Sequence, residues 1–447
     1  MSRTIVVGAG VAGLVAARDL AEAGAEVLVL EGSDRAGGKL RVGEVAGVRV
    51  DTGAEAMLHR HPEGIALAAD LGLPLVHPTD ASTRIWTRGA LRPLPRNLMG
   101  APLDLDQLEA SGILSPEGLA RARDQRVPEP ADDRSVGDLV AERFGDEVVD
   151  RIVEPLLGGV YAGQARRISA RSAVPQLLDL LGRPEFTLPP PPADAGPVFA
   201  AVDGGMWRLP AALDADLRDR PGVEVRYDAP ATALRRTGSG WVVTTPGGEE
   251  AAGSVVLAVP ASPSARLLAE VAPAASAELG EIAYASVAVV TFAYRADDPA
   301  VAEALDIGAS GLLVPPVDGR RIKASTFSFA KWDWVRAAGS GLLLLRTSLG
   351  RFGEEPALQV ADEELVRVSR ADLAEATGLT AAPLDVVVQR WGGSLPQFWV
   401  GHADRVARIR AAVSAVPGLA VCGAAYDGVG IPATIRSAHA AAALLAR

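Results

Sequence analysis

Three glycines near the N-terminus constrain the fold of this chain more than any other feature. Gly8, Gly10 and Gly13 stand at G-x-G-x-x-G spacing within the sequence GAGVAG. A short β-branched run, Thr4–Val7, precedes them, and a helix-forming stretch, Val11–Ala23, follows. The first glycine of such a unit permits a tight turn, the second lets a pyrophosphate approach the backbone, and the third lets helix and strand pack closely. The sequence therefore predicts a strand–turn–helix unit that opens a parallel sheet.

An acidic residue after the second predicted strand supports binding of a dinucleotide. Glu31 directly follows the strand Glu26–Leu30. It stands about 20 residues beyond the glycines, where the ribose-binding carboxylate of a dinucleotide fold is expected. The alternative is a plain tight turn without a ligand. The combined pattern favours the dinucleotide, with the candidate ligands Gly8, Ala9, Gly10, Val11, Ala12, Gly13 and Glu31.

Composition and charge exclude several classes of protein. Of the 447 residues, 49% are hydrophobic and 22% are charged, as in an ordinary soluble globular chain. The formal net charge of −11 argues against a general nucleic-acid binder, which needs a basic surface. No apolar run approaches the ~18 residues of a membrane span, and the N-terminus shows no signal peptide. We expect a cytoplasmic protein without an integral membrane segment, and we leave peripheral contact with a membrane open.

Cysteine and histidine usage argues against metal chemistry. Cys422 is the only cysteine, so the chain has no intrachain disulfide and no thiolate cluster. The five histidines show no metal-ligand spacing with acidic residues. We therefore expect no metal site.

Changes of pattern along the chain indicate three domains. Residues 93–200 carry apolar residues at helical spacing and end in the proline-rich loop Arg183–Pro197. Alternating strands such as Tyr284–Tyr294 follow. The predicted fold class is α/β: a Rossmann-type domain (1–60, 201–265 and 395–447), an α+β substrate domain with a mixed sheet (61–92 and 266–394) and a mainly helical domain (93–200).

Three further strands are predicted after the helical domain. They are Val223–Tyr227, Trp241–Thr245 and Ser254–Val259, separated by turn residues. Because they follow one another closely, we expect a three-stranded meander beside the parallel sheet.

Two more stretches carry unusual patterns. The sequence GSDRAGGKLRV places Arg35 and Gly37–Lys39 after Glu31 in the order E-x-x-x-R-x-G-G-[RK], and DTGAE, Asp51–Glu55, follows it. Near the other end, Gly418–Leu445 (GLAVCGAAYDGVGIPATIRSAHAAAALL) reads as a buried strand, a glycine-rich turn and a final helix.

These stretches resemble the flavin amine oxidase superfamily, and within it the protoporphyrinogen and coproporphyrinogen III oxidases. LGGVYAG (Leu157–Gly163), VEVRYDAPA (Val223–Ala231) and RWGGSLPQFWVGH (Arg390–His402) are similar to further segments of that family, so the resemblance covers nearly the whole chain. It implies a noncovalent FAD held by both ends of the chain. The further cofactor ligands that it implies are Gly32, Arg35, Gly37, Gly38, Lys39, Thr52, Gly53, Ala54, Glu55, Val225, Trp391, Val429, Gly430 and Ile431.

The resemblance also implies an activity. A nonaromatic tetrapyrrole would give a hydride from a meso carbon to flavin N5, and O₂ would reoxidise the flavin with release of H₂O₂. Repeated rounds, six electrons in all, would yield the porphyrin in haem biosynthesis, and ferrochelatase is an expected partner. The Ala/Arg-rich composition looks actinobacterial, and relatives of Gram-positive type act on coproporphyrinogen III, so we favour this substrate over protoporphyrinogen IX.

Candidate substrate residues fall into two groups, and no side chain is assigned as a catalytic base. Gly159, Tyr161 and Gly163 stand in the segment that lines the substrate cavity of the family. Because guanidinium and ammonium groups bind carboxylates, the candidates for the substrate propionates are Arg60, Arg84, Arg96, Arg166, Arg167 and Lys323.

Three other functions stay open: oxidation of protoporphyrinogen IX, another flavin amine or phytoene-type oxidation, and non-catalytic carriage of flavin or porphyrin. Amine oxidases usually place a lysine near flavin N5, where this chain has Arg266, and this departure weakens the amine-oxidase reading. Cys422 falls within a predicted strand, and we expect it in the core rather than attached to flavin.

Overall fold

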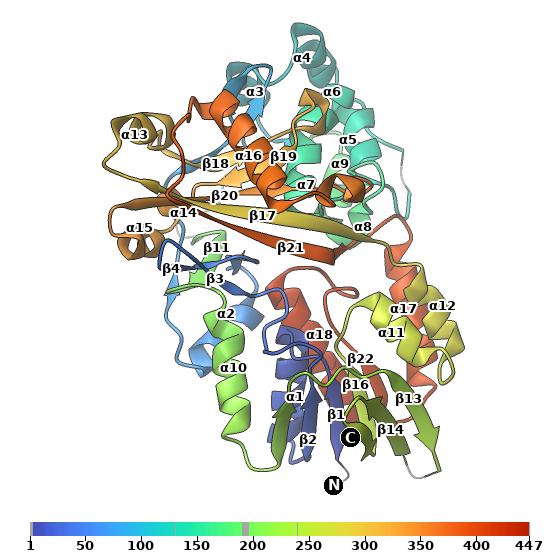
Figure 1. Ribbon diagram of the computed structural model, residues 1–447. Coiled ribbons are helices and arrows are strands. Elements are labelled where there is room, and N and C mark those ends of the chain that lie inside the picture. Colours follow the sequence, from blue (N-terminus) through green and yellow to red (C-terminus); the bar gives the residue numbers. More distant parts are fainter. Residues whose placement is uncertain (1–2, 130, 190–195, 239, 447) are drawn as a thin grey trace.

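The computed structural model describes residues 3–129, 131–189, 196–238 and 240–446. Two halves lie one above the other (Figure 1). A parallel sheet with its helices forms the lower half, which also carries both chain ends, and a mixed sheet with a helical block forms the upper half. Each half is assembled from stretches that lie far apart in the sequence.

A five-stranded parallel sheet forms the centre of the lower half. Its order is β12-β2-β1-β16-β22, and every neighbouring pair is parallel. The central strands are continuous apolar runs because both faces of the sheet are covered. The bounds are β1 (Thr4–Val7), β2 (Val27–Leu30), β12 (Val223–Arg226), β16 (Ser254–Leu257) and β22 (Leu419–Val421).

Alternate side chains of this sheet enter two separate cores. Val6 and Val29 pack with the layer of α1 (Val11–Glu22), α10 (Arg208–Arg218) and α18 (Ile431–Leu445). Ile5 and Leu28 pack with the opposite layer. That layer contains β13 (Ala233–Thr237), β14 (Gly240–Thr245), β15 (Gly248–Ala252), α11 (Ala261–Leu268), α12 (Pro273–Gly280) and α17 (His402–Ser414). The predicted α/β class with a Rossmann-type domain is confirmed.

The prediction that three strands form a meander was wrong, because two of them lie in another sheet. β12 and β16 both belong to the parallel sheet, and only β14 lies in the small antiparallel sheet, between β13 and β15. β15 begins within Pro246–Glu250, a stretch whose composition predicts a turn. Short strands of similar composition do not identify their partners, since pairing depends on the surrounding packing.

A seven-stranded mixed sheet spans the upper half. Its order is β21-β17-β20-β19-β18-β7-β8. The long strand β17 begins at Tyr284, as predicted, and pairs antiparallel with β20 and β21. The bounds are β7 (Ser82–Thr87), β8 (Ala90–Pro93), β17 (Tyr284–Arg295), β18 (Ala309–Leu313), β19 (Ile322–Thr326), β20 (Leu342–Leu349) and β21 (Asp385–Pro396), and α16 (Asp362–Thr377) packs against this sheet.

Short helices form a block beside the mixed sheet. They are α3 (Leu105–Ser111), α4 (Pro116–Arg123), α5 (Val136–Phe144), α6 (Asp146–Val148), a π-helical turn (Val149–Val153), α7 (Glu154–Tyr161), α8 (Ala170–Ala173) and α9 (Pro175–Leu181). Ser135 caps α5, because its hydroxyl accepts the Asp138 N–H at 3.0 Å. The predicted proline-rich loop follows α9, and its residues 190–195 lie outside the described part of the chain.

One predicted domain boundary moves in the light of the packing. Helix α2 (Pro62–Asp70) packs against α18, and Leu67 belongs to the same core as α1. The chain joins the mixed sheet only at β7. We therefore propose a boundary near residues 77–81 instead of 60/61. The remaining division into three domains stays our proposal.

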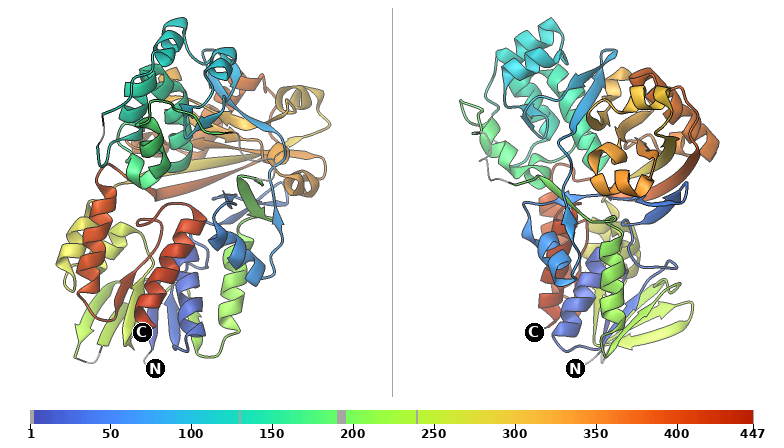
Figure 2. Two further views of the ribbon diagram at one scale, coloured as in Figure 1. Left: turned by 180° about the vertical axis from the view of Figure 1, so that it is seen from behind. Right: turned by 90° about the vertical axis from the view of Figure 1, so that its left-hand side faces the viewer.

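Helices α1 and α18, from opposite ends of the chain, lie side by side (Figure 2). Their buried faces carry many small side chains, which let two helices approach closely. These include Ala12, Ala16 and Ala17 of α1 and Ala438, Ala441 and Ala442 of α18. Because α1 follows β1 and α18 follows β22 of one parallel sheet, both helices begin at the same edge of that sheet.

The small residues of this contact lead to a test of stability. Ala438 is fully buried in the core that α18 shares with α1, whereas Ala440 is exposed. We expect Ala438→Leu to lower the free energy of unfolding by about 1–3 kcal/mol, because added methylene groups have no space there. Ala440→Leu should change it by less than about 0.5 kcal/mol. Denaturant unfolding of both variants checks this, and equal stability of the two would contradict the close packing.

Candidate functional site

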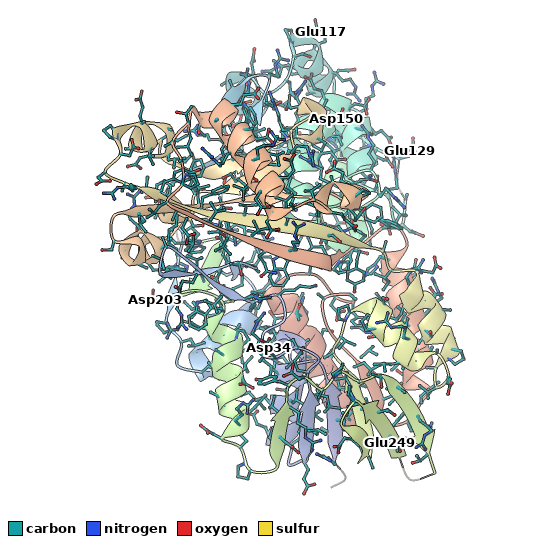
Figure 3. All side chains as sticks on the ribbon, viewed as in Figure 1. Asp34, Glu117, Glu129, Asp150, Asp203 and Glu249 are labelled. Carbon is teal, nitrogen blue, oxygen red and sulfur yellow. The ribbon has the colours of Figure 1, made fainter. Side chains whose placement is uncertain are left out.

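The carboxyl edge of the parallel sheet gathers the first set of candidate residues. β1, β2 and β22 end there, and α1 and α18 begin there. In open α/β folds this edge is where ligands bind. Asp34, in the loop just after Glu31, marks this edge in Figure 3, where it lies toward the mixed sheet.

The three glycines of the first motif have three different environments. Gly8 has a φ of +104°, and a Cβ there would lie 2.8 Å from the Ala258 carbonyl oxygen. A Cβ on Gly13 would lie 1.8 Å from the Gly8 carbonyl oxygen. A Cβ on Gly10 would meet nothing within 4 Å. The space beside Gly10 is therefore open to a ligand, whereas Gly8 and Gly13 are required by the fold itself.

Helix α1 begins without a side-chain cap. Gly10 is its N-cap residue, and Val11 and Ala12 form its buried first turn. The first N–H groups of a helix have no partner within the helix and carry partial positive charge. This end of α1 can therefore bind an anionic group.

Glu31 is fixed beside the glycine turn. Its Oε2 accepts the Ala9 N–H at 2.7 Å, and its Oε1 accepts the N–H and the hydroxyl of Ser33 at 2.9 and 2.8 Å. Gly32 is exposed next to it. Val225 lies on the neighbouring strand, where it is paired with Val29 and packs toward the core that contains α1. The structure thus brings Glu31 to the glycines and places Val225 one strand further out.

The turn at Gly37–Lys39 packs against the first motif. The Gly37 N–H donates to the Ala9 carbonyl at 2.9 Å, and a Cβ on Gly38 would lie 3.3 Å from Gly10 Cα. Burial lowers the pKa of Lys39 to about 8. Within the described residues no carboxylate lies within ion-pair distance of Lys39, whereas Arg35, half-exposed, lies 3.9 Å from the Asp34 carboxylate. A partly buried cation without an anion suits a phosphate ligand.

The segment DTGAE, residues 51–55, packs against Lys39 on one side. A Cβ on Gly53 would lie 1.9 Å from the Lys39 carbonyl oxygen, and the Ala54 N–H donates to that oxygen at 3.4 Å. Thr52 is buried, and its carbonyl accepts the Trp391 indole N–H at 3.0 Å. Glu55 does not face the open space, because its two carboxylate oxygens contact Lys331 at 2.7 Å and Arg346 at 3.0 Å.

The start of α18 supplies a second uncapped helix end. Gly430 is its N-cap residue and Ile431 its first residue, and no side chain caps it. Val429 packs toward the helical block, in a group that includes Trp399. Two helix N-termini therefore stand at one edge of the sheet, and both favour negative charge.

The candidate substrate segment lies at the end of α7. Tyr161 is buried, with its ring 5.7 Å from that of Phe398, and burial raises its pKa to about 12. Gln397 donates to the Tyr161 carbonyl at 2.8 Å. A Cβ on Gly163 would lie 2.4 Å from Gln397 Oε1, whereas one on Gly159 would meet only Leu313 at 3.8 Å. Gly163 also lines a cavity with Glu154, Arg351 and Phe352, among others.

The structure does not bring the cationic candidates together. Arg96 donates to the carbonyls of Leu188 and Pro189, so it anchors the loop after α9. Lys323 is buried on β19, where burial and nearby Arg351 lower its pKa to about 7. Arg60 is exposed just after β5 (Met57–Leu58), and Arg84 lies on β7.

Two adjacent arginines differ sharply in their surroundings. Arg166 lies within 4 Å of three carboxylates, Asp138, Asp146 and Asp150. Arg167 instead lies over the Trp399 ring, 3.6 Å from its centroid. Arg167 is exposed and, in the described part of the chain, has no carboxylate within ion-pair distance, so of these two arginines it is the one available to an anion.

Sequence reasoning missed three residues that organise this region: Lys331, Arg346 and Gln397. Arg346 is the only charged residue in the otherwise apolar and hydroxylic strand LLLLRTSL, and a charge in a buried strand was a usable signal. Lys331 is one of only three lysines in the chain. Local sequence could not show which residues they contact, because Lys331 and its partner Glu55 are 276 residues apart.

Comparison with known proteins decides the family. Residues 11–446 match the family model described as flavin containing amine oxidoreductase. This chain belongs to that family. It is 39% identical to the coproporphyrinogen III oxidase of Mycobacterium tuberculosis (strain H37Rv), covering 97% of this chain and 95% of the relative, and 30% identical to that of Bacillus subtilis (strain 168), covering 98% and 96%. A solved structure from Exiguobacterium sp. 255-15, provisionally assigned as a protoporphyrinogen oxidase, has a TM-score of 0.88 at 29% identity and covers 99% of this chain and 98% of that one.

The residues at the sheet edge fit the flavin that the family implies. An anionic nucleotide would find space beside Gly10 and donors at the two uncapped helix ends and at the Lys39 ammonium, which has no carboxylate partner among the described residues. Cys422 is fully buried, and burial raises the pKa of its thiol to about 12. Among the described residues, no helix is long and apolar enough to cross a membrane.

The contrast between Gly10 and Gly13 gives a test of the candidate flavin cradle, which consists of the glycine turn at Gly8–Gly13, Lys39 and the starts of α1 and α18. We expect Gly10→Ala to leave the stability of the flavin-free protein within about 0.5 kcal/mol, because its Cβ has free space, yet to weaken flavin binding at least tenfold by filling that space. Gly13→Ala should lower stability by about 3 kcal/mol, because its Cβ would collide with the Gly8 carbonyl. Denaturant unfolding and flavin titration measure both effects. Unchanged flavin affinity in the Gly10 variant would show that the ligand lies elsewhere.

Proposed function

We propose that this protein is an FAD-dependent oxidase that converts coproporphyrinogen III to coproporphyrin III, with O₂ as electron acceptor and H₂O₂ as product, in porphyrin and haem biosynthesis. The observation that carries the proposal is the 39% identity to the M. tuberculosis coproporphyrinogen III oxidase over 97% of this chain. The site supports it, because both ends of the chain supply groups suited to one flavin nucleotide.

The division of labour at the proposed site follows from the positions of the residues. The end of α1 and Lys39 would meet the diphosphate, Glu31 would meet the ribose, and the start of α18 would face the electron-rich edge of the flavin. When bound, the flavin would supply hydride-accepting and O₂-reducing chemistry. Noncovalent binding is supported by the burial of Cys422, since its thiol cannot readily ionise there.

The protein's task toward the substrate is to hold it and to bind its carboxylates. Coproporphyrinogen III carries four propionates, so several cations should lie around the substrate. Arg167 is the preferred cation because its exposed guanidinium lies on the Trp399 ring. Trp399 contacts Phe352, and Phe398 contacts Tyr161, so these rings lie near the Tyr161–Gly163 segment. Lys323 lies beside Arg351, which lines the cavity with Gly163 and Phe352, but burial lowers the pKa of Lys323 to about 7. Arg60 and Arg84 remain proposals of lower rank.

One alternative is supported by a specific finding. The Exiguobacterium structure is provisionally assigned as a protoporphyrinogen oxidase, so protoporphyrinogen IX is the second candidate substrate. Amine oxidation has less support, because Arg266 is exposed and donates to Ser262 of its own helix. The proposed location is the cytoplasm, which is consistent with a lone buried cysteine. The proposed partner is ferrochelatase.

A direct assay tests the function. Purified protein is supplied aerobically with coproporphyrinogen III and with protoporphyrinogen IX in parallel, and the porphyrin absorbance band and peroxide are measured. We expect kcat/KM for coproporphyrinogen III to exceed that for protoporphyrinogen IX by at least tenfold. The reverse ratio would assign the second substrate. Porphyrinogen that leaves the bound flavin oxidised under anaerobic conditions would instead indicate a carrier.

Lys39 predicts a pH dependence of FAD binding. With a pKa near 8 in the free protein, Lys39 is charged below pH 8, and affinity should not depend on its titration there. Above pH 8 the free protein loses a proton that the complex retains, so affinity should fall by up to about tenfold per pH unit. Lys39→Arg should remove this fall, because arginine stays protonated. Fluorescence titration from pH 7 to 9.5 checks both. Identical pH profiles of the wild type and Lys39→Arg would show that Lys39 does not bind the phosphates.

A further inference from the structure

The segment 51–55 lies between the two halves of the molecule. Strand β4 (Val48–Asp51) leads into it, and the hairpin of β3 (Val42–Val45) and β4 lies beneath β17 and β21 in Figure 1. On its lower side the segment packs against the turn that carries Lys39, because Gly53 and Ala54 both approach the Lys39 carbonyl. One side of this short segment therefore belongs to the candidate flavin cradle.

The other side of the segment is held by side chains of the upper half. The Arg346 Nη1 donates to the Gly53 carbonyl at 2.7 Å and to the Asp51 carbonyl at 3.3 Å. The Trp391 indole donates to the Thr52 carbonyl between them. Three successive carbonyls are thus bound by two side chains from β20 and β21. Of these three residues only Asp51 belongs to a strand, at the end of β4.

Arg346 is itself held by a buried carboxylate. Its Nη2 lies 3.0 Å from Glu55 Oε2, and the Lys331 Nζ lies 2.7 Å from Glu55 Oε1. Burial opposes ionisation of Glu55, but the charges of Arg346 and Lys331 outweigh it and lower the pKa of Glu55 to about 2. The carboxylate is therefore ionised throughout the neutral range. Its pair with Arg346 is well shielded from water.

The backbone that carries Arg346 is paired with a strand on each side. Arg346 stands opposite Thr291 of β17 on one side and opposite Thr326 of β19 on the other. A central strand bonded on both sides has little freedom to move. A guanidinium can contact a carboxylate and backbone carbonyls at the same time through separate nitrogens, whereas an ammonium on a flexible stem cannot reproduce this fork.

We propose that Arg346 is a positioning residue that fixes the backbone of segment 51–55 against the flavin, so that the mixed sheet determines the flavin environment. This inference rests on the proposed function in so far as segment 51–55 faces the flavin. Arg346 contacts segment 51–55 and not a group assigned to the reaction. It acts through the carbonyls of Asp51 and Gly53 and through the ion pair with Glu55.

Three substitutions and one control test the proposal on the full-length protein. Arg346→Met removes the charge and the donors at similar length, Arg346→Lys keeps only the charge, and Glu55→Gln keeps the shape of the acceptor. Arg295→Met is the matched control, since Arg295 is an exposed arginine at the end of β17 whose side chain, across the described ranges, pairs only with Asp297. FAD affinity, the visible circular dichroism of bound FAD, thermal unfolding and amide hydrogen exchange of residues 51–55 in the flavin-free protein are measured.

We expect Arg346→Met to exchange the amides of Thr52 and Ala54 at least tenfold faster than the wild type, to bind FAD at least tenfold more weakly and to change the dichroism of the bound flavin. Arg346→Lys should show smaller effects than Arg346→Met. Glu55→Gln should change exchange, FAD affinity and dichroism in the same direction as Arg346→Met. The Arg295→Met control should match the wild type. A residue that only stabilised the fold would lower the unfolding temperature and leave flavin affinity and dichroism unchanged.

The proposal is overturned if folded Arg346→Met binds FAD within twofold of the wild type with an unchanged spectrum. If Arg346→Met does not fold, the same criteria apply to Arg346→Lys and Glu55→Gln. Failure of the proposed function has a different signature: the wild type then takes up no flavin or oxidises no porphyrinogen. The exchange measurement still decides whether Arg346 orders segment 51–55 in that case.

Discussion

The close contact between α1 and α18 is the constraint on which the rest of this structure depends. Both helices follow strands of one parallel sheet, so their N-termini lie at the same edge, and small side chains let them stand next to each other. Neither helix has a side-chain cap at that end. Two sets of free N–H groups are therefore concentrated at one place, although nearly the whole chain separates them in sequence. A flavin nucleotide, with an anionic diphosphate and an electron-rich ring edge, is the ligand that such an arrangement suits.

Local charge at this edge runs against the charge of the whole protein. The chain carries a formal net charge of −11, yet the groups around Gly10 are two positive helix ends and Lys39. Glu31, the acid of the motif, is neutralised in part by three hydrogen-bond donors from Ala9 and Ser33. Glu55 is directed away and satisfied by Lys331 and Arg346. The overall charge is thus acidic, while positive groups at this edge have no carboxylate partner in the described part of the chain and can bind an anion.

The two halves are joined where the reaction is proposed to occur. Trp391 and Arg346 reach from the mixed sheet to carbonyls of segment 51–55, and Val429 reaches from the start of α18 to the helical block. These contacts cross between the half with the parallel sheet and the half with the mixed sheet. If one half holds the flavin and the other the substrate, as we propose, the two ligands need a fixed mutual geometry. Buried charged contacts with several hydrogen bonds supply a specific one.

The sequence by itself determined the βαβ unit, the flavin family, the long strand from Tyr284 and the helical block, because these depend on local spacing, on periodicity and on motifs. The tertiary structure alone decided that β12 and β16 join the parallel sheet, since strand pairing depends on which faces are buried and not on neighbouring sequence. It also decided which charged residues are free. Arg166 and Arg167 are adjacent and chemically identical, yet one lies among three carboxylates and the other on an indole ring. Glu55 resembled a cofactor ligand in the motif, but its oxygens are occupied by residues hundreds of positions away. A side chain's chemistry depends on its partners, and long-range partners exist only once the chain has folded.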